Sequence, residues 1–228
     1  MTAIDEPHYL TATRASYDTA AANYAKFAAD ILAENPFDRA VLALYAELVH
    51  DSAPGGGGRV VEIGCGPGRI AAHLAGLGLD MSGIDLSPGM IEQARQRYPD
   101  LEFRVGQMAA LDLPPASLAG LVAWYSLIHI PPAEHPAVLA GFRRVLAPGA
   151  HLLLAFHMGD ELRRVTDAYG HTGLDVDSYR LPPERVEQQA VQAGFLPVAR
   201  LTREARSPEK APQAYLILRV ADAATEEH

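Results

Sequence analysis

The chain has 228 residues, of which 49% are hydrophobic and 21% charged, the profile of one large globular domain with a full core. No apolar run is long enough to span a membrane, and the acidic start of the chain lacks the apolar segment of a signal peptide. A formal net charge of −9 argues against nucleic-acid binding, which needs a basic face. The single cysteine, Cys65, excludes an internal disulfide. We therefore predict a cytoplasmic monomer or homodimer that acts on a small molecule, with no nucleic-acid or membrane partner.

Two helical patterns precede a glycine-rich joint at residues 51–58. The second pattern runs from about Asp38 to His50, and the first is predicted to end at Pro36. The first pattern places small, apolar and aromatic side chains on one face, namely Tyr17, Ala20, Ala21, Tyr24, Phe27 and Ile31. We predict that residues 1–58 form a helical cap or lid and that residues 59–228 form the core.

After the joint, short apolar strands alternate with helical patterns. Strands are predicted at Arg59–Ile63, Leu79–Ile84, Leu101–Val105, Leu118–Tyr125 and His151–Phe156. The helices between them are predicted at about Pro67–Ala75, from the N-cap Ser87 to Pro99, and from after Pro132 to Pro148-Gly149. This alternation predicts an α/β fold with a mostly parallel sheet and helices on both faces.

The C-terminal part follows a different pattern. A helix at Pro183–Ala193 precedes two strands, Phe195–Arg203 and Tyr215–Val220, with no helix between them. Successive strands without a crossover helix predict an antiparallel hairpin at one sheet edge. Residues 158–181 are predicted to be a long loop-like insertion, of the kind that often forms a lid near a substrate site.

The most informative stretch is a buried strand that runs into a glycine turn and then a helix. Gly64, Gly66 and Gly68 form the turn, and the next strand ends at Asp85. That spacing places a carboxylate where ribose hydroxyls lie in a nucleoside-binding unit. A dinucleotide motif needs its third glycine at position 69, which is Arg69 here, and no Lys-Ser/Thr pair follows as in a P-loop.

Three segments carry a family resemblance: E-I-G-C-G-P-G, G-I-D-L-S-P-G-M and G-Q-M-A-A-L-D-L-P, with F-R-R-V-L-A-P-G-A-H-L-L-L further on. Together they resemble the class I S-adenosylmethionine-dependent methyltransferases, in particular the small-molecule branch that includes the ubiquinone and menaquinone biosynthesis type. The resemblance covers about Tyr17 to Val220. It implies S-adenosyl-L-methionine as cofactor and a Rossmann-like, seven-stranded, mostly parallel sheet with an antiparallel last strand.

The resemblance also implies a cofactor site. Gly64, Gly66 and Gly68 would line the methionine moiety, with Cys65 as a small turn residue between them and Glu62 near the ammonium end or bracing the loop. The remaining implied contacts are Asp85 on the ribose, Leu86 and Met90 on adenine, Gln107 and Met108 at the adenine edge, and Tyr125 at the amino-acid end. Family members often have an acidic residue in place of Gln107. The lid tyrosines Tyr17 and Tyr24 could face the sulfonium or simply pack in the core.

Methyl transfer is an in-line displacement, and a base helps when the acceptor is a hydroxyl or a protonated amine. Candidate bases are His129 and His157, each following a predicted strand, and less directly His171 in the insertion. A structural role for each histidine stays open. No acidic residue lies between Pro115 and Pro132, so we predict a metal-independent enzyme that acts on a small molecule. The sequence does not encode the acceptor atom legibly, and we favour oxygen or nitrogen.

Three other functions remain open at this stage. A cyclase or another enzyme of non-methyl chemistry could use the same fold and cofactor. A non-catalytic module could bind S-adenosylmethionine without turnover, and a nicotinamide-dependent oxidoreductase is the third alternative.

Overall fold

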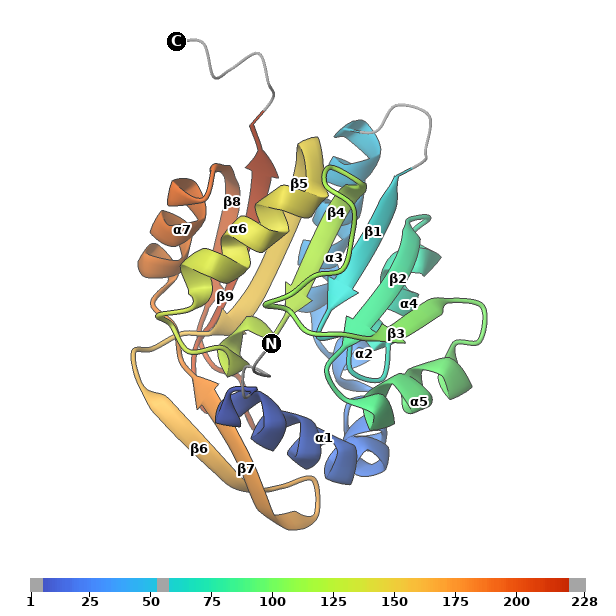
Figure 1. The fold of residues 1–228 in the computed structure, drawn as a ribbon, viewed down its shortest axis with the longest axis vertical. Coiled ribbons are helices and arrows are strands. Elements are labelled where there is room, and N and C mark those ends of the chain that lie inside the picture. Colours follow the sequence, from blue (N-terminus) through green and yellow to red (C-terminus); the bar gives the residue numbers. More distant parts are fainter. Residues whose placement is uncertain (1–5, 53–57, 222–228) are drawn as a thin grey trace, which may run out of the picture.

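A computed structural model describes residues 6–52 and 58–221 of the chain. Its centre is a seven-stranded sheet in the order β3-β2-β1-β4-β5-β9-β8 (Figure 1). The strands are β1 (Arg59–Ile63), β2 (Asp80–Asp85), β3 (Glu102–Val105), β4 (Leu118–Trp124), β5 (Leu146–His157), β8 (Phe195–Arg203) and β9 (Gln213–Val220). Only β9 runs antiparallel to its neighbours β5 and β8. The predicted fold class and the predicted antiparallel hairpin at the sheet edge are both confirmed.

Helices cover both faces of this sheet. They are α1 (His8–Phe27), α2 (Ile31–Glu34), α3 (Pro36–Ser52), α4 (Arg69–Gly76), α5 (Pro88–Arg97), α6 (His135–Val145) and α7 (Pro183–Gln192), with a short 3-10 turn η1 (Leu127–His129). One core cluster joins α6 and α7 to the sheet, and a second joins α3, α4 and α5 to its other face. The central strands β1 and β4 contribute to both clusters, which explains the unbroken apolar sequence of β4.

The predicted N-terminal cap divides into two parts in the structure. Helix α3 packs on the sheet as a core helix, and the buried hydroxyl of Tyr45 lies 3.3 Å from the carbonyl oxygen of Leu121 in β4. Helix α1 instead lies across the carboxyl ends of the strands (Figure 1). The first helix ends at Phe27 rather than near Pro36, and the short α2 separates the two longer helices. Part of the glycine-rich joint, residues 53–57, lies outside the described residues.

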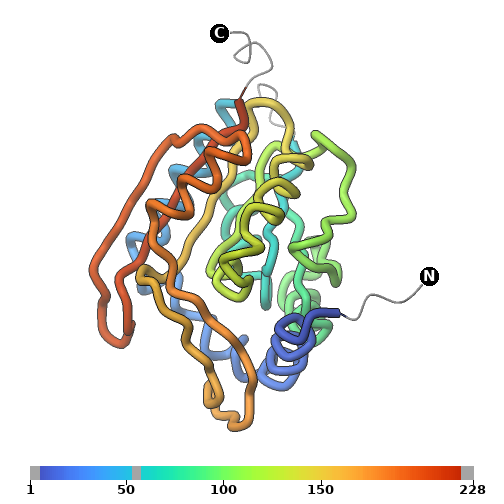
Figure 2. The backbone as a smooth tube through the Cα atoms, turned by 60° about the vertical axis from the view of Figure 1, so that its left-hand side comes forward, coloured from blue at the N-terminus to red at the C-terminus, as the bar shows by residue number. Residues whose placement is uncertain are grey.

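The prediction of a loop-like insertion at residues 158–181 is wrong in one respect. Most of the segment is a regular antiparallel hairpin of β6 (Leu162–Ala168) and β7 (His171–Tyr179). The hairpin forms a separate two-stranded sheet and packs against α1 at the carboxyl end of the main sheet (Figure 2). The hydroxyl oxygen of Ser16 in α1 accepts a hydrogen bond of 2.9 Å from the backbone N–H of Asp175 in β7.

Several boundaries also differ. Helix α6 ends at Val145, and the Pro148-Gly149 pair that was predicted to stop it lies within β5, which begins at Leu146. Among the described residues, no helix is long and apolar enough to cross a membrane.

Candidate active site

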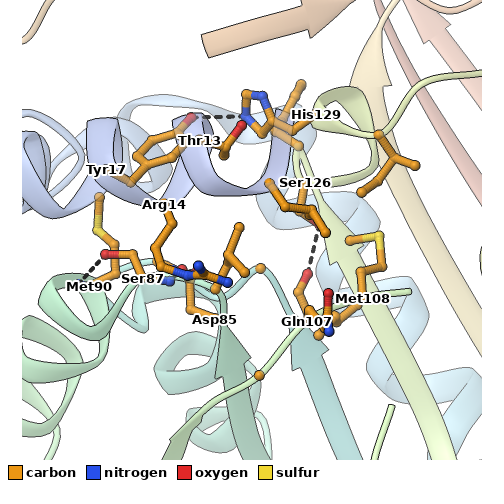
Figure 3. Close-up of a pocket in the computed structure, with 18 of the residues that line it drawn as sticks. Thr13, Arg14, Tyr17, Asp85, Ser87, Met90, Gln107, Met108, Ser126 and His129 are labelled. Carbon is orange, nitrogen blue, oxygen red and sulfur yellow. Dashed lines mark hydrogen bonds between the residues drawn. The ribbon is translucent and has the colours of Figure 1, made fainter. Parts of the chain in front are cut away.

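The strand order reverses between β1 and β4, and in open α/β sheets ligands bind outside the carboxyl ends of the strands at such a point. A cavity lies there, roofed by α1 (Figure 3). Its walls include eleven of the predicted site residues: Tyr17, Tyr24, Gly64, Gly66, Asp85, Leu86, Met90, Gln107, Met108, Tyr125 and His129. The structure thus brings most of the predicted site together, whereas Glu62, Cys65, Gly68 and His157 lie outside this first cavity.

Asp85 ends β2 with its carboxylate held by the backbone. Oδ2 accepts a hydrogen bond of 2.7 Å from the N–H of Gly66, and Oδ1 accepts one of 2.8 Å from the N–H of Ser87. Burial raises the pKa of Asp85 to about 6, although these two bonds oppose the rise. The carboxylate is therefore fixed in orientation, and each oxygen keeps a lone pair for a further donor.

The three turn glycines have different structural roles. All three have positive φ, but a side chain on Gly64 would overlap Ser126, and one on Gly68 would lie 2.7 Å from the ring of Phe103. A side chain on Gly66 would meet only Tyr24, at 3.6 Å. Gly64 and Gly66 line the cavity, whereas Gly68 is the buried N-cap residue of α4. Gly66 is thus the open point of the turn, where only the absence of a Cβ leaves room for a ligand.

Glu62 and Cys65 lie beneath the turn. Both are buried, at 2% and 4% exposure. Glu62 accepts a 2.9 Å hydrogen bond from the N–H of Ala71 in the first turn of α4, and burial raises its pKa to about 8. Of the two roles predicted for Glu62, this geometry corresponds to bracing the loop. Burial raises the pKa of the Cys65 thiol well above its usual value, which makes it a poor nucleophile.

Apolar side chains form the wall beyond Asp85. Met90 and Met108 line the cavity together with the polar Gln107 (Figure 3), and Leu86 lines it as well. Ser87 caps α5 as predicted, because its hydroxyl accepts a 3.0 Å hydrogen bond from the N–H of Met90. This wall suits a flat, mostly apolar group with a polar edge.

Helix α1 contributes more to the cavity than its tyrosines. Leu10, Thr13 and Arg14 also line it, and sequence reasoning missed them. They continue the face of Tyr17 and Tyr24 one to two turns toward the N-terminus, so extending the 3.6-residue period would have found them. Ser126 and Ser87 were missed as lining residues as well.

A second cavity of about 830 Å³ adjoins the first. Tyr17, Tyr24, Tyr125 and His129 line both cavities, and His157 lines only the second. Other walls come from α2, from the β6–β7 hairpin and from residues 206–213. The shared residues form the boundary between a smaller pocket and a larger chamber.

The hydrogen bonds of His129 determine its tautomer. Its Nδ1 lies 2.9 Å from the carbonyl oxygen of Asp177, which can only accept, so Nδ1 carries the proton. In the neutral ring, Nε2 then accepts the 2.9 Å hydrogen bond from the hydroxyl of Tyr17. Burial lowers the pKa of His129 below its usual value, so the ring is neutral at pH 7. His129 therefore presents a basic lone pair at the boundary of the two cavities.

His157 is held in the same tautomer. Its Nδ1 lies 2.9 Å from Oε1 of Gln213, whose amide nitrogen donates to the carbonyl of Ala211 at 2.6 Å. Nδ1 is thus the donor, and burial lowers the pKa of His157 as well. Its ring lies 4.9 Å from that of Tyr125, which has an unusual φ of +53°. Strain of this kind in a non-glycine residue is often found at functional sites.

The third candidate histidine, His171, is not among the residues that line either cavity. Its Nε2 lies 3.2 Å from the amide nitrogen of Asn23, near the tip of the β6–β7 hairpin. In the described part of the chain, no three His, Cys, Asp or Glu side chains are grouped as metal ligands.

Comparison with known proteins finds methyltransferases among the similar sequences. Residues 60–149 match a family model described as a methyltransferase domain. The chain is 36% identical to a trans-aconitate 2-methyltransferase of Methylobacterium nodulans, over 64% of this chain and 51% of that protein. It is 33% identical to an S-adenosyl-L-methionine-dependent Diels-Alderase of Talaromyces variabilis, over 52% of this chain and 43% of that protein. The chain spans about half the length of the curated relatives it matches.

A solved structure extends the agreement to the whole fold. The 1,6-didemethyltoxoflavin-N1-methyltransferase of Burkholderia thailandensis, bound to S-adenosylhomocysteine, aligns with a TM-score of 0.69 at 18% identity. The alignment covers 97% of this chain and 93% of that one. Residues 60–149 therefore match the methyltransferase domain family, and the whole chain has the fold of this solved methyltransferase.

Proposed function

We propose that this protein transfers a methyl group from S-adenosylmethionine to oxygen or nitrogen of a small-molecule acceptor. The observation that supports this proposal most is the pairing of the two cavities. One contains the oriented carboxylate of Asp85 and the open turn at Gly66, and it meets the larger chamber at His129. The first suits the nucleoside end of the cofactor, and the second suits an acceptor.

The residues of the first cavity fit the cofactor. Asp85 would hold the ribose hydroxyls, and Leu86, Met90 and Met108 would pack on adenine. When bound, the cofactor supplies an electrophilic methyl group on a positively charged sulfur. The rings of Tyr17 and Tyr24, which meet edge to face at 5.9 Å, offer aromatic surface that favours such a cation.

The chain's own residues would then orient the acceptor and remove its proton. The Nε2 lone pair of His129 is held by the Nδ1 hydrogen bond to Asp177, and an acceptor hydroxyl or ammonium could take the place of the Tyr17 hydroxyl as its partner. Helix α1 and the β6–β7 hairpin pack against each other beside the site, where they would limit the access of water to the reacting groups. Alignment and a neutral base are the two contributions that this reaction needs.

A direct test is turnover. The protein would be incubated with S-adenosylmethionine and a panel of hydroxyl, carboxyl and amine acceptors, and S-adenosylhomocysteine and methylated products would be quantified by mass spectrometry. The proposal predicts that the two products appear together. Binding of the cofactor without turnover on a broad panel would instead favour a non-catalytic module.

Cyclisation is a second candidate, favoured by the similarity to the Diels-Alderase and by the aromatic walls of the second cavity. It predicts that a polyene substrate is converted to an isomer of the same mass with no consumption of the cofactor, which chromatographic separation of substrate and product would detect. We also propose that the protein is a cytoplasmic monomer or homodimer with no nucleic-acid partner, supported by its single cysteine and its net charge of −9.

A further inference from the structure

Arg69 is a charged residue that the proposed reaction has not used. It is the first residue of α4, directly after the glycine turn, and it lines the second cavity. Its Nη1 atom is buried and has no hydrogen-bond partner among the described residues. A buried N–H of a charged group that lacks an acceptor is costly, so such an atom calls for an explanation.

The nearby protein carboxylates are engaged elsewhere. The charge of Arg69 acts on both Glu62 and Asp38, because it opposes the rise in pKa that burial causes in each. However, Asp38 accepts a 2.6 Å hydrogen bond from the hydroxyl of Tyr215, and Glu62 accepts from the N–H of Ala71. Neither carboxylate is hydrogen-bonded to Nη1. An acceptor from outside the chain would satisfy this atom.

The position of Arg69 limits what that acceptor is. The charge of Arg69 and a side-chain hydrogen bond from it to Tyr24 both oppose the rise in the pKa of Tyr24, so Nη1 is the atom of Arg69 that lacks a partner. The side chain of Tyr24 lines both cavities and lies over Gly66. The guanidinium is therefore close to the boundary where the amino-acid end of the cofactor and the acceptor would meet. A guanidinium matches the planar geometry of a carboxylate and binds it through two parallel hydrogen bonds.

We infer that the inner end of the second cavity is a carboxylate-binding subsite with Arg69 as its anchor. The inference rests on the proposed function, which supplies two sources of a carboxylate. One is the amino-acid end of S-adenosylmethionine, and the other is a carboxylate group on the methyl acceptor.

The experiment compares wild type, Arg69→Gln and the control Arg97→Gln, which removes the same charge from an exposed position on α5. Isothermal titration calorimetry measures the affinity of each protein for S-adenosylhomocysteine and for 5′-methylthioadenosine. The second compound has the same nucleoside and a thioether but lacks the carboxylate. Benzoate, with benzamide as its neutral counterpart, is then titrated into the protein with and without S-adenosylhomocysteine. Circular dichroism verifies that each variant is folded.

Two results would support the subsite and identify the source. If the cofactor supplies the carboxylate, Arg69→Gln weakens S-adenosylhomocysteine binding by about 10- to 100-fold and leaves 5′-methylthioadenosine within about two-fold. If the acceptor supplies it, S-adenosylhomocysteine affinity is unchanged, and wild type binds benzoate but not benzamide while Arg69→Gln binds neither. Arg97→Gln behaves as wild type in both cases.

Other results would overturn the inference. If a folded Arg69→Gln variant lost affinity equally for S-adenosylhomocysteine and for 5′-methylthioadenosine, Arg69 would only support the glycine turn. No effect on S-adenosylhomocysteine or on benzoate would show that no carboxylate binds there. Failure of wild type to bind S-adenosylhomocysteine would contradict the proposed function instead, and the benzoate titration would still test the subsite.

Discussion

At the scale of single residues, Glu62 is a buried carboxyl whose protonation is coupled to folding. Its pKa is about 8 in the folded protein and near 4.5 when exposed, so the folded state holds its proton more tightly. The stability that this proton contributes is complete below about pH 4.5 and is lost as the pH rises through about 8. We expect Glu62→Gln to remove this pH dependence, which is on the order of a few kcal/mol, while keeping an acceptor for the N–H of Ala71.

Urea unfolding of wild type and Glu62→Gln at several pH values between 5 and 8 measures this effect. Glu47→Gln, on the exposed side of α3, is the matched control and should follow wild type. If the free energy of unfolding changed with pH in the same way for wild type and Glu62→Gln, Glu62 would already be ionised in the folded protein.

His129 is the residue on which the proposed chemistry depends. Burial lowers its pKa, so the neutral, basic form dominates at pH 7 and is lost only as the pH falls below the ordinary histidine value of about 6.5. We expect wild-type kcat to decrease on the acid side of that value. His129→Gln should lower kcat by about 10²–10⁴-fold, with S-adenosylhomocysteine affinity changed by no more than a few-fold.

The profile of kcat against pH for wild type, His129→Gln and His157→Gln distinguishes the two histidines. The acid inflection should disappear in His129→Gln and persist in His157→Gln. Rates within a few-fold of wild type in both variants would mean that the enzyme works by alignment alone and that the base assignment is wrong.

At the scale of elements, the glycine turn separates ligand access from packing. Both Gly66 and Gly68 have positive φ, which costs an alanine about 1–2 kcal/mol. Gly68→Ala also brings its Cβ within 2.7 Å of the Phe103 ring, so we expect it to lose mainly stability. Gly66→Ala projects into the cavity, so it should lose mainly S-adenosylhomocysteine affinity, by about 10-fold or more. Urea unfolding and calorimetry on both variants test the contrast, and the reverse ranking would contradict it.

Helix α1 and the β6–β7 hairpin form a candidate lid. The Oδ1 atom of Asp18 accepts a 2.8 Å hydrogen bond from the N–H of Gly89, which docks α1 on α5, and Ser16 connects α1 to β7. We expect hydrogen exchange in residues 8–27 and 162–179 to slow when S-adenosylhomocysteine binds. Helix α3, which packs on the sheet, should be unchanged and serves as the internal control. Equal exchange of the lid segments with and without the ligand would count against closure.

At the scale of the whole molecule, the main sheet was predictable because its strands are apolar and are separated by clear turn and cap signals. Ser87, for instance, caps α5 as its sequence position predicts. The β6–β7 hairpin was not predictable from local pattern. Its strand β6 is largely exposed and has no apolar alternation. Of its two turn residues, Gly170 is typical, but Tyr169 has a φ of +53° at a position where Asn, Asp or Gly is usual.

Tertiary contacts explain both the hairpin and the limits of the site prediction. The ring of Tyr169 packs 4.9 Å from that of Tyr24, so α1 stabilises a turn that the hairpin sequence alone does not favour. The residues predicted to hold the cofactor follow a sequence motif, and most of them line one cavity. The tautomers of His129 and His157 depend on Asp177 and Gln213, which are far away in the sequence.

We propose above all that the cavity at Asp85 binds the nucleoside of S-adenosylmethionine. Isothermal titration of S-adenosylhomocysteine into wild type, Asp85→Ala and Asp80→Ala tests it most directly, since Asp80 is an exposed aspartate at the other end of the same strand. We predict one site in wild type, an affinity about 10- to 100-fold weaker in Asp85→Ala, and no change in Asp80→Ala. No binding to wild type, or equal affinity of wild type and Asp85→Ala, would contradict the account.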